Sequence, residues 1–547
     1  MDNASAVASV DHPACIERIP PGSATLQDRY RLGGDPDVRP LFPRPWDEEA
    51  ILDRRMAPLD RVRLAEILVD QNRRWQGGEA VLTNAAKIGH DQTRVVVTGQ
   101  QVGLALGPLF TVYKAVTAIQ QARRLARERG GAPVVPVFWM ATEDHDLAEV
   151  LQPLVLQSDL GAWKPLSLAR PPGMKNAGAV GRLTLPDSVE GWIQQLPMAG
   201  SDFAEDVRAL LHASYAPGTR LSDAFAKLLH RLLPDSGLVI IDADHPELKA
   251  MAAPLWEQAL AEPDRIMQAL AGRTWELEAR FAAPLRLRPP HLFLLDDEGR
   301  HAIDVDHGVY TVAGRPGRFS YAEIRAQCGA SWQHVSPNVV LRPLYQDFLL
   351  PNLAYVAGPG EVAYFAQIAP AYEALGLDMP TIWPRGSYAW LTPSLGRVLR
   401  QEGLSIADVA ADPLTWFKSE AMAHLPVDSE ALLSTLRRDL ERALATFEQD
   451  ARAVHPDFHG ASAVAAARID RIQHYLARRL TKAARKRNAT FENRILRLRN
   501  HAYPQGRPQE RIMSALSLVA YRGLDVFRKA PDWLDEDPTA QHVYEIP

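Results

Sequence analysis

The chain has 547 residues, a formal net charge of −5 at pH 7, and a composition that is 46% hydrophobic and 23% charged. This length predicts about two to four structural units, and the mild negative charge argues against a protein that coats nucleic acid. The only two cysteines, Cys15 and Cys328, exclude a disulfide framework and a zinc site built from paired thiolates. We expect a reducing compartment and, because no signal peptide or long apolar segment is evident, a cytoplasmic location.

The first 91 residues are expected to form an N-terminal segment that wraps the surface and ends in a helix. Residues 1–46 are rich in Pro, Gly and Asp, whereas residues 48–75 alternate charged and aliphatic side chains at helical spacing. Residues 92–160 are then predicted to form the first part of a Rossmann-like core.

The clearest signal is a strand, a glycine turn, a helix and a second strand between residues 94 and 146. A run of valines ends at Thr98 and Gly99, apolar residues then recur at helical spacing, and residues 134–139 are apolar again. Such a unit makes two parallel strands joined by a right-handed crossover. Ligands of open parallel sheets bind beyond the carboxyl ends of the strands. The glycine turn and the acidic turn at 143–146 are therefore predicted to share one edge.

The glycine turn, TGQQVGLALGPL, matches neither of the standard phosphate-binding loops, because no GK[ST] follows and the spacing is not G-x-G-x-x-G. Glycines after a strand still let the backbone approach an anion, and the following helix points its amide groups at it. The alternative is that Gly99 only turns the chain and that Gly107 with Pro108 only starts the helix. The residues predicted to bind substrate or nucleotide here are Thr98, Gly99, Gln100, Gln101, Gly103 and Lys114.

The acidic turn TEDHD places three carboxylates and an imidazole directly after an apolar strand. A subset of them could act as a general base, hold a cation that bridges phosphates, or bind a substrate ammonium. The alternative is helix capping by Thr142, with acids favoured in the first turn. No dedicated metal site is predicted. The predicted catalytic residues are Asp144, His145 and Asp146, and Glu143 is a predicted binding residue.

Residues 161–335 are expected to continue the core and to carry an inserted helical and hairpin subdomain. Helices are predicted around residues 203–211 and 221–233, and GLVIIDAD at 237–244 is typical of another buried strand that ends in acids. The alternation in residues 291–312 predicts a hairpin.

Residues 336–425 form the predicted second part of the core. Ser336 is expected to cap a helix that Pro337 begins, and NLAYVAGPGEVAYF repeats the order of strand, glycine turn and helix. Glu361 either binds a ligand or is a favourable charge at the start of a helix. An arginine at a sheet edge suits carboxylates or phosphates, and the alternative is that it only forms an ion pair at the surface. The residues predicted to bind here are Asn338, Arg342, Gly358, Gly360, Glu361, Trp383 and Arg385.

Residues 426–502 change in character and predict a helical arm. Apolar residues at 433, 436, 440, 444 and 447 recur at spacings of three or four, residues 456–460 interrupt the pattern, and a second long helix follows. Two such helices predict an antiparallel coiled coil. The basic stripe at 478–499 is either a nucleic-acid surface or, as its few aromatic residues favour, a solvated or subunit-facing surface. Residues 503–547 are expected to pack back on the core as helices.

Four blocks, TGQQVGLALGPLFTVYK, PVFWMATEDHD, NVVLRPLYQDFLLP and AYVAGPGEVAYF, closely resemble the cysteine ligase family of bacillithiol biosynthesis and occur in the same order. The closing QERIMSALSLVAYRG is similar to the end of that family, more loosely. The resemblance implies an α/β fold: a Rossmann-like parallel sheet core with inserted connecting subdomains and a C-terminal α-helical antiparallel coiled-coil arm. It also implies a homodimer that pairs through the arm.

The resemblance further implies an enzyme that joins the carboxylate of L-cysteine to the amino group of glucosaminyl malate, the last step of bacillithiol synthesis. Because amide formation from a free carboxylate is uphill in water, ATP is the expected co-substrate, with Mg²⁺ as a possible companion and no bound organic cofactor. No nucleic-acid or membrane partner is implied.

As a hypothesis, Asp144 or Asp146 would hold the incoming amine or a cation, and His145 would assist proton transfer. Arg342 and Arg385 would receive malate carboxylates or phosphate. Two alternatives stay open: a non-catalytic scaffold that binds a nucleotide or sugar, and a ligase that uses a different amino-sugar acceptor.

Overall fold

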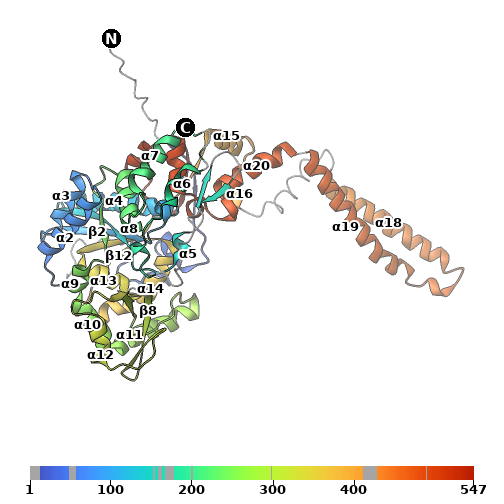
Figure 1. Ribbon diagram of the computed structural model, residues 1–547. Coiled ribbons are helices and arrows are strands. Elements are labelled where there is room, and N and C mark those ends of the chain that lie inside the picture. Colours follow the sequence, from blue (N-terminus) through green and yellow to red (C-terminus); the bar gives the residue numbers. More distant parts are fainter. Residues whose placement is uncertain are drawn as a thin grey trace, which may run out of the picture. The chain divides into compact units, whose positions relative to one another are not determined.

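The chain folds into two compact units in the computed structural model (Figure 1). The structure describes residues 13–48, 57–151, 154–157, 163–166, 178–196, 198, 201–296, 299–410, 428–487 and 489–546. The first unit comprises residues 1–389 and 508–544, and the second comprises residues 390–507 and 545–547. The chain therefore leaves the first unit and returns to it. Parts of the predicted N-terminal wrap, residues 1–12 and 49–56, lie outside the described residues.

A five-stranded parallel sheet forms the centre of the first unit, with the strand order β12-β11-β2-β3-β6. Its strands are β2 (Arg94–Gln100), β3 (Val134–Met140), β6 (Val239–Asp242), β11 (Asn352–Ala357) and β12 (Thr381–Pro384). Val97 lies between Val137 of β3 and Tyr355 of β11, and every neighbouring pair is parallel. Such sheets are covered on both faces, which is why these strands are almost continuously apolar. The predicted Rossmann-like α/β core is confirmed.

Opposite faces of the sheet bury different helices, because successive strand residues point to opposite sides. Val96 packs with alanines of α4 (Phe110–Glu128), the helix that connects β2 to β3. Val97 belongs instead to the larger core, which includes Leu64 of α2 (Arg61–Arg74). The helix predicted after the glycine turn is thus confirmed as the crossover helix.

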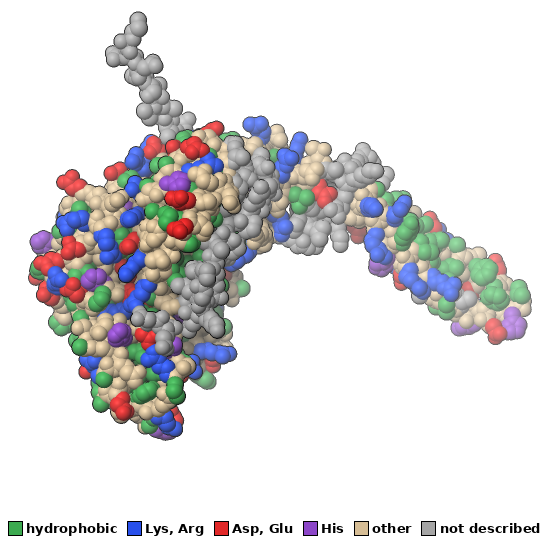
Figure 2. Space-filling model, viewed as in Figure 1, with side chains coloured by type: hydrophobic (Ala, Val, Ile, Leu, Met, Phe, Trp, Pro, Cys, Tyr) green, Lys and Arg blue, Asp and Glu red, His purple; other side chains and the backbone are tan. Residues whose placement is uncertain are grey.

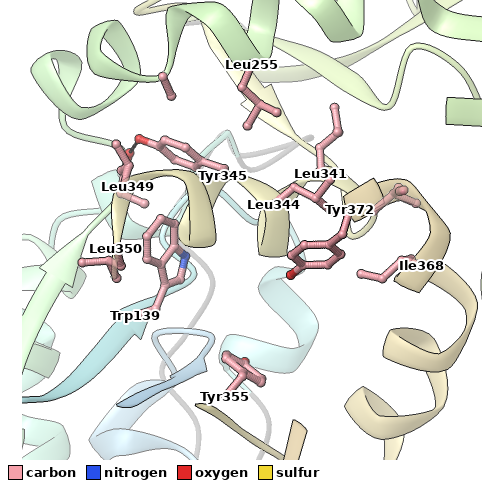
Figure 3. Close-up of a cluster of buried hydrophobic side chains, with 14 of the residues drawn as sticks. Trp139, Leu255, Leu341, Leu344, Tyr345, Leu349, Leu350, Tyr355, Ile368 and Tyr372 are labelled. Atoms are coloured by element: carbon pink, nitrogen blue, oxygen red, sulfur yellow. Dashed lines mark hydrogen bonds between the residues drawn. The ribbon is translucent and has the colours of Figure 1, made fainter. Parts of the chain in front are cut away.

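Aromatic side chains fill the space between the sheet and the helices α13 (Leu341–Leu349) and α14 (Pro359–Ala374) (Figure 3). Trp139 of β3 meets Tyr345 of α13 edge to face, with ring centres 5.3 Å apart. Tyr355 of β11 is also fully buried in this cluster. Large aromatic rings supply much apolar contact for few rotatable bonds, so they make a firm base beneath the ends of β3 and β11.

An antiparallel sheet with the order β10-β7-β8-β9 is inserted between β6 and α13. Its strands are β7 (Leu292–Asp296), β8 (Gly299–Asp306), β9 (Val309–Val312) and β10 (Val335–Pro337), which confirms the predicted hairpin. The prediction that Ser336 caps a helix begun by Pro337 is wrong. Ser336 pairs with Phe293 of β7, so its backbone belongs to the antiparallel sheet. The side-chain oxygen of Asn338 instead accepts hydrogen bonds from the N–H groups of Val340 and Leu341 at the start of α13.

The middle and the end of the first unit add further elements. The helices predicted in the middle are α7 (Ala204–Ser214) and α8 (Leu221–Leu232), and both are confirmed. A small sheet with the order β1-β14-β13 uses β1 (Ala14–Ile19), β14 (Gln541–Glu545) and β13 (Ser387–Leu391). The C-terminal residues also reach the crossover helix region, since the Leu109 N–H donates to the Met513 carbonyl at 2.7 Å.

The second unit is helical and contains α18 (Ser429–Ala451), α19 (Ala461–Arg487) and α20 (Ala489–Ala502). Helices α18 and α19 pack along each other, and Gln473 donates to the Leu433 carbonyl at 3.0 Å. The predicted second long helix passes through Asn488, which lies outside the described residues. Figure 2 shows apolar side chains at the surface of this helix pair. Within the described ranges, no helix has both the length and the low charge needed to cross a membrane.

Candidate active site

A pocket of about 610 Å³ lies where β2, β3 and β11 end, at the carboxyl edge of the parallel sheet. This is the edge at which open α/β sheets bind ligands. The residues around it include Gly99, Gln100, Gln101, Lys114, Glu143, Asp144, Glu149, Arg286, Arg288, Arg300, Asn338, Arg342, Tyr355, Gly358, Gly360, Glu361, Tyr364, Arg385 and Arg511. Both glycine turns and the acidic turn therefore contribute to one pocket.

Lys114 of α4 joins the two glycine turns. Its Nζ donates to the Gly99 carbonyl at 2.8 Å and to Gln100 Oε1 at 3.1 Å, and it forms an ion pair with Glu361. The Gly358 N–H donates to Glu361 Oε2 at 2.7 Å, which places this carboxylate at the start of α14. Glu361 thus serves as a cap and as the partner of Lys114.

Burial disfavours both charges of the Lys114–Glu361 pair. It lowers the pKa of Lys114, and the neighbouring Glu361 carboxylate opposes this effect. Burial would also raise the pKa of Glu361, but the Lys114 ammonium and the Gly358 N–H outweigh it and hold that pKa below its usual value. Glu361 is therefore ionised at neutral pH and supports a positive charge at the base of the pocket.

Arg342 of α13 is held beside this pair by aromatic residues. Its guanidinium donates to the Tyr364 hydroxyl at 2.7 Å and lies 5.7 Å from the ring centre of Tyr355. Both hydroxyls in turn donate to Glu361 Oε1, at 3.4 Å from Tyr364 and at 2.7 Å from Tyr355. In the part of the chain that the structure describes, no carboxylate forms an ion pair with Arg342. Its guanidinium can therefore receive an anion in the pocket.

The acidic turn divides its side chains between the pocket and its surroundings. Glu143 and Asp144 line the pocket, whereas His145 and Asp146 are not among the lining residues. Glu143 is buried, while the side chains of Asp144 and His145 are 40% and 45% exposed. Glu143 is thus the member of this turn that faces the pocket in a water-poor environment.

Asp146 caps the short helix α5 (Leu147–Val150), because its carboxylate accepts from the Glu149 N–H at 3.0 Å. The alternative that Thr142 caps a helix here is wrong. The hydroxyl of Thr142 donates to Asp242 Oδ1 at 2.6 Å, across to the end of β6. Thr142 cannot cap this helix because α5 begins only at Leu147, directly after Asp146.

Arg300 of β8 anchors His145 at the edge of the pocket. Its guanidinium donates to Ser336 Oγ at 3.0 Å and to the Pro337 carbonyl at 2.6 Å, and it lies 3.9 Å from the ring centre of Phe293. It also lies 3.1 Å from His145 Nδ1. Because a guanidinium can only donate, Nδ1 accepts, and a neutral His145 carries its proton on Nε2.

A buried cluster of charges lies behind Glu143. Lys249 of α9 (Pro246–Met251) has no exposed surface, and its Nζ lies 2.8 Å from Glu143 Oε1 and 2.6 Å from Asp244 Oδ1. Arg182 also binds Asp244, with its Nη2 donating to Oδ1 at 2.9 Å. Burial raises the pKa of Glu143 to about 7, although Lys249 opposes the shift.

Three residues predicted to bind do not line the pocket. The hydroxyl of Thr98 is buried and donates to the Val356 carbonyl at 2.9 Å, which ties β2 to β11. At Gly103, an added Cβ would lie 2.9 Å from the Gly107 Cα, so this glycine permits a tight turn. Trp383 packs in the smaller core beside α4.

Arg385 lines the pocket but is occupied by an ion pair. Its two terminal nitrogens donate to Glu510 at 2.8 and 2.5 Å, in bidentate fashion, and both side chains are buried. Its Nε has no hydrogen-bond partner among the described residues and lies near Gly358. Only this nitrogen of Arg385 is left for a ligand.

Reasoning from the sequence did not find Lys249, Arg300 or Glu510. The acids of GLVIIDAD were predicted to end a buried strand, and the scarcity of lysine in this chain is the signal that could have directed attention to Lys249, five residues after Asp244. Arg300 lies in an ordinary hairpin, and Glu510 lies 125 residues from Arg385. Neither carries a local signal.

Groups of both charges line the pocket. Lys114 and Arg342 are positive, and Glu143, Asp144 and Glu149 of the acidic turn and α5 are negative. Such an arrangement can orient molecules that carry an anionic group at one end and an amine at the other. Among the described residues, no group of three or more His, Cys, Asp or Glu side chains is arranged to hold a metal ion.

Two family models together cover most of the chain. Residues 23–386 match "Bacillithiol biosynthesis BshC, N-terminal Rossmann-like domain", and residues 390–545 match the C-terminal coiled-coil domain of the same family. A protein of Salinibacter ruber named "Putative cysteine ligase BshC" is 36% identical over 479 residues, which cover 86% of each chain.

Two further relatives carry the same name. The protein of Symbiobacterium thermophilum is 31% identical over 552 residues, covering 94% of this chain and 97% of the relative. The protein of Bacillus cereus is 26% identical over 518 residues, covering 92% of this chain and 95% of the relative. The similarity therefore extends over nearly the full length of both chains.

Proposed function

The chain belongs to the BshC family of bacillithiol biosynthesis, and we propose that it is a ligase that joins L-cysteine to the amino group of glucosaminyl malate. The names of its relatives support a cysteine ligase. The observation that carries the proposal is the pocket itself, which brings together the two glycine turns, the acidic turn and Arg342.

The charges around the pocket suit the three reactants of this reaction. Lys114 and Arg342 provide positive charge for carboxylates or phosphates, and the guanidinium fork of Arg342 favours bidentate contacts. Glu143 and Asp144 provide the negative charge that an ammonium group requires. The volume of about 610 Å³ lies within the usual range for small-molecule sites, roughly 300 to 1,000 Å³.

ATP is the proposed co-substrate, because a free carboxylate does not form an amide spontaneously in water. Transfer of a phosphoryl or adenylyl group to the cysteine carboxylate would create a better leaving group and divide one difficult step into two easier ones. Gly358 and Gly360 precede and begin α14, so the backbone there can approach an anion closely, and the helix start favours negative charge.

The contacts of the acidic turn guide the roles that we propose for its residues. The carboxylate of Asp146 caps α5, and the Nδ1 atom of His145 is occupied by Arg300, so proton transfer by neutral His145 would have to use the Nε2 proton. We assign the binding of the incoming ammonium to Glu143 and Asp144.

The second unit supports the proposed homodimer. Leu432 of α18 and Ile472 and Tyr475 of α19 are exposed large apolar residues, an arrangement that favours burial against a second copy of the helix pair. Sedimentation of the wild type and of the variant Ile472→Lys with Tyr475→Lys tests this assignment. A dimer that persists in the variant at the same concentration contradicts it.

The ligase proposal is tested with purified protein, glucosaminyl malate, cysteine and ATP. Mass spectrometry should detect the amide product, and the appearance of AMP or ADP distinguishes an adenylate from an acyl phosphate. Omission of each substrate in turn is the control. If a different amino sugar is cysteinylated faster than glucosaminyl malate, that sugar is the acceptor and the proposed substrate is wrong.

A deletion strain distinguishes the ligase from a scaffold protein that only binds a nucleotide or sugar. Loss of a ligase should make glucosaminyl malate accumulate and the cysteinylated thiol disappear. Unchanged thiols in a strain that makes bacillithiol would contradict the proposal.

A further inference from the structure

We propose that Glu143 is the base that removes a proton from the acceptor ammonium, and that Lys249 positions Glu143 for this step. The proposal rests on the ligase function proposed above and adds a catalytic residue and a positioning residue to it. It starts from the buried cluster behind the pocket, in which one lysine is shared by two carboxylates.

The cluster is built by two neighbouring strands. Met140 at the end of β3 pairs with Asp242 at the end of β6, so the acidic turns that follow both strands leave the sheet side by side. Glu143 comes from the first turn and Asp244 from the second. Lys249 reaches both carboxylates from α9, the helix that follows β6.

A lysine with no exposed surface is costly to retain. Removing an ammonium group from water costs several kcal/mol even after relaxation, and a well-packed apolar residue would often be at least as stable. Lys249 offsets part of this cost through its contacts to Glu143 at 2.8 Å and Asp244 at 2.6 Å. A fold that keeps such a group directly behind a pocket is typical of a functional site.

Within the cluster, Glu143 is the carboxylate that can exchange a proton. For Asp244, burial acts to raise the pKa, but Lys249 and Arg182 outweigh it and hold that pKa below the usual value. Burial raises the pKa of Glu143 to about 7 despite Lys249. Glu143 also lines the pocket, whereas Asp244 does not. A base acts best when its pKa lies near the working pH.

Other charged groups face Glu143 and shape the same titration. Arg300 from β8 and Arg182 near the end of β6 are positive neighbours, and Asp244 is a negative neighbour. Burial and the negative charge of Glu143 both raise the pKa of Tyr345 of α13, so its phenol stays protonated. These groups come from different elements of the fold, which hold them in fixed positions around Glu143.

The chemical step balances as follows. The carboxylate of Glu143 takes one proton from the acceptor R–NH₃⁺ and leaves the neutral amine with a free electron pair. The amine attacks the carbonyl carbon of the activated cysteine, a C–N bond forms, and the C–O bond to the phosphate or AMP leaving group breaks. The attacking nitrogen then loses its second proton to solvent or to the departing phosphate oxygen.

Kinetics of the wild type and of Glu143→Gln between pH 6 and 9 test the catalytic role. Glutamine keeps the shape of the side chain but cannot take the proton, so kcat at saturating acceptor should fall about 100- to 10,000-fold. The KM for the acceptor should rise as well, because the charge that binds its ammonium group is lost. Glu190→Gln, an exposed change on α6 (Ser188–Gln194), is the matched control and should leave kcat unchanged. A kcat within threefold of the wild type in Glu143→Gln overturns the role of the base.

Lys249→Met tests the positioning role. Loss of the ammonium should raise the pKa of Glu143 by about one to three units, so the rising limb of the pH–rate profile should move to higher pH and activity should recover there. A merely structural lysine would lower the rate by the same factor at every pH, and that result overturns the role of Lys249. If Lys249→Met does not fold, the shift is sought in Lys249→Gln, which also removes the charge. Lys249→Arg keeps the charge and should keep the wild-type limb.

A spectroscopic titration separates this inference from the ligase function. If wild-type protein forms no amide, the proposed reaction is wrong, whatever Glu143 does. Infrared difference spectra of wild type against Glu143→Gln then report the carboxyl group directly. Protonation of Glu143 near pH 7 supports its assignment as the base, and protonation at the pH of an ordinary glutamate overturns that assignment.

Discussion

Substitution of Glu510 distinguishes a structural role of Arg385 from a ligand-binding role. Arg385 and Glu510 are only 4% and 5% exposed, and two charge-assisted hydrogen bonds join them. Glu510→Gln replaces one acceptor oxygen with a donor and leaves a buried guanidinium without its counter-charge. Breaking a buried pair in this way costs about 3 to 5 kcal/mol, so Glu510→Gln should lower the free energy of unfolding by about that amount.

Urea unfolding followed by tryptophan fluorescence measures the change. The matched control is Glu247→Gln, because Glu247 pairs with Arg63 at the surface, where the side chains are 49% and 44% exposed and such a pair contributes less than about 1 kcal/mol. The double variant Arg385→Met with Glu510→Leu should recover most of the loss. If Glu510→Gln costs no more than the control but weakens substrate binding, the buried pair is not structural and Arg385 is a ligand residue.

Three other predictions concern the glycine turn, the charge pair beneath it and a buried histidine. Gly99→Ala should destabilise the protein by about 1 to 3 kcal/mol in urea unfolding, because the new Cβ would lie 2.9 Å from a carbonyl oxygen of β3, whereas Gly191→Ala, with open space around it, should stabilise its helix by up to about 1 kcal/mol. Lys114→Met should cost about 3 to 5 kcal/mol, and adding Glu361→Gln should restore stability without restoring ligation, an outcome that a merely structural pair would not give. Burial lowers the pKa of His230 from 6.5 to about 4, so below pH 6.5 the unfolded chain binds a proton that the folded chain does not. Stability should therefore fall by up to about 3 kcal/mol between pH 6.5 and 4, and a pH series of urea midpoints with His230→Asn should lack this part of the slope.

The sequence predicted the core well because its signals are local. A run of valines, a glycine and a helical repeat define β2, the turn and α4 within about 35 residues, and the same pattern recurs at β11 and α14. The edge at which strands of a parallel sheet end then brings the turns together without further information. Lys114 and Glu361, which follow the two glycine turns, were predicted as pocket residues on this basis.

The rest of the site depends on contacts between distant segments. Ser336 looked like a helix cap in isolation, but its pairing with β7 is decided by the inserted sheet. The role of Lys249 becomes evident only when β6 lies beside β3, because no local sequence pattern predicts a buried lysine. Thr98 and Trp383 lie close in sequence to residues of the pocket, yet their side chains point into the packed layers around the sheet.

The return of residues 508–544 to the first unit affects how the protein can be divided. The family model of the Rossmann-like domain ends at residue 386, which invites an expression fragment that stops there. Such a fragment would contain Arg385 without Glu510, and Leu109 without the backbone of Met513 that receives its hydrogen bond. Its sheet would retain every strand, but a buried cation beside the pocket would be unpaired. The two regions that sequence comparison separates are therefore not independent parts, because the lining of the pocket includes Arg511 from the second region.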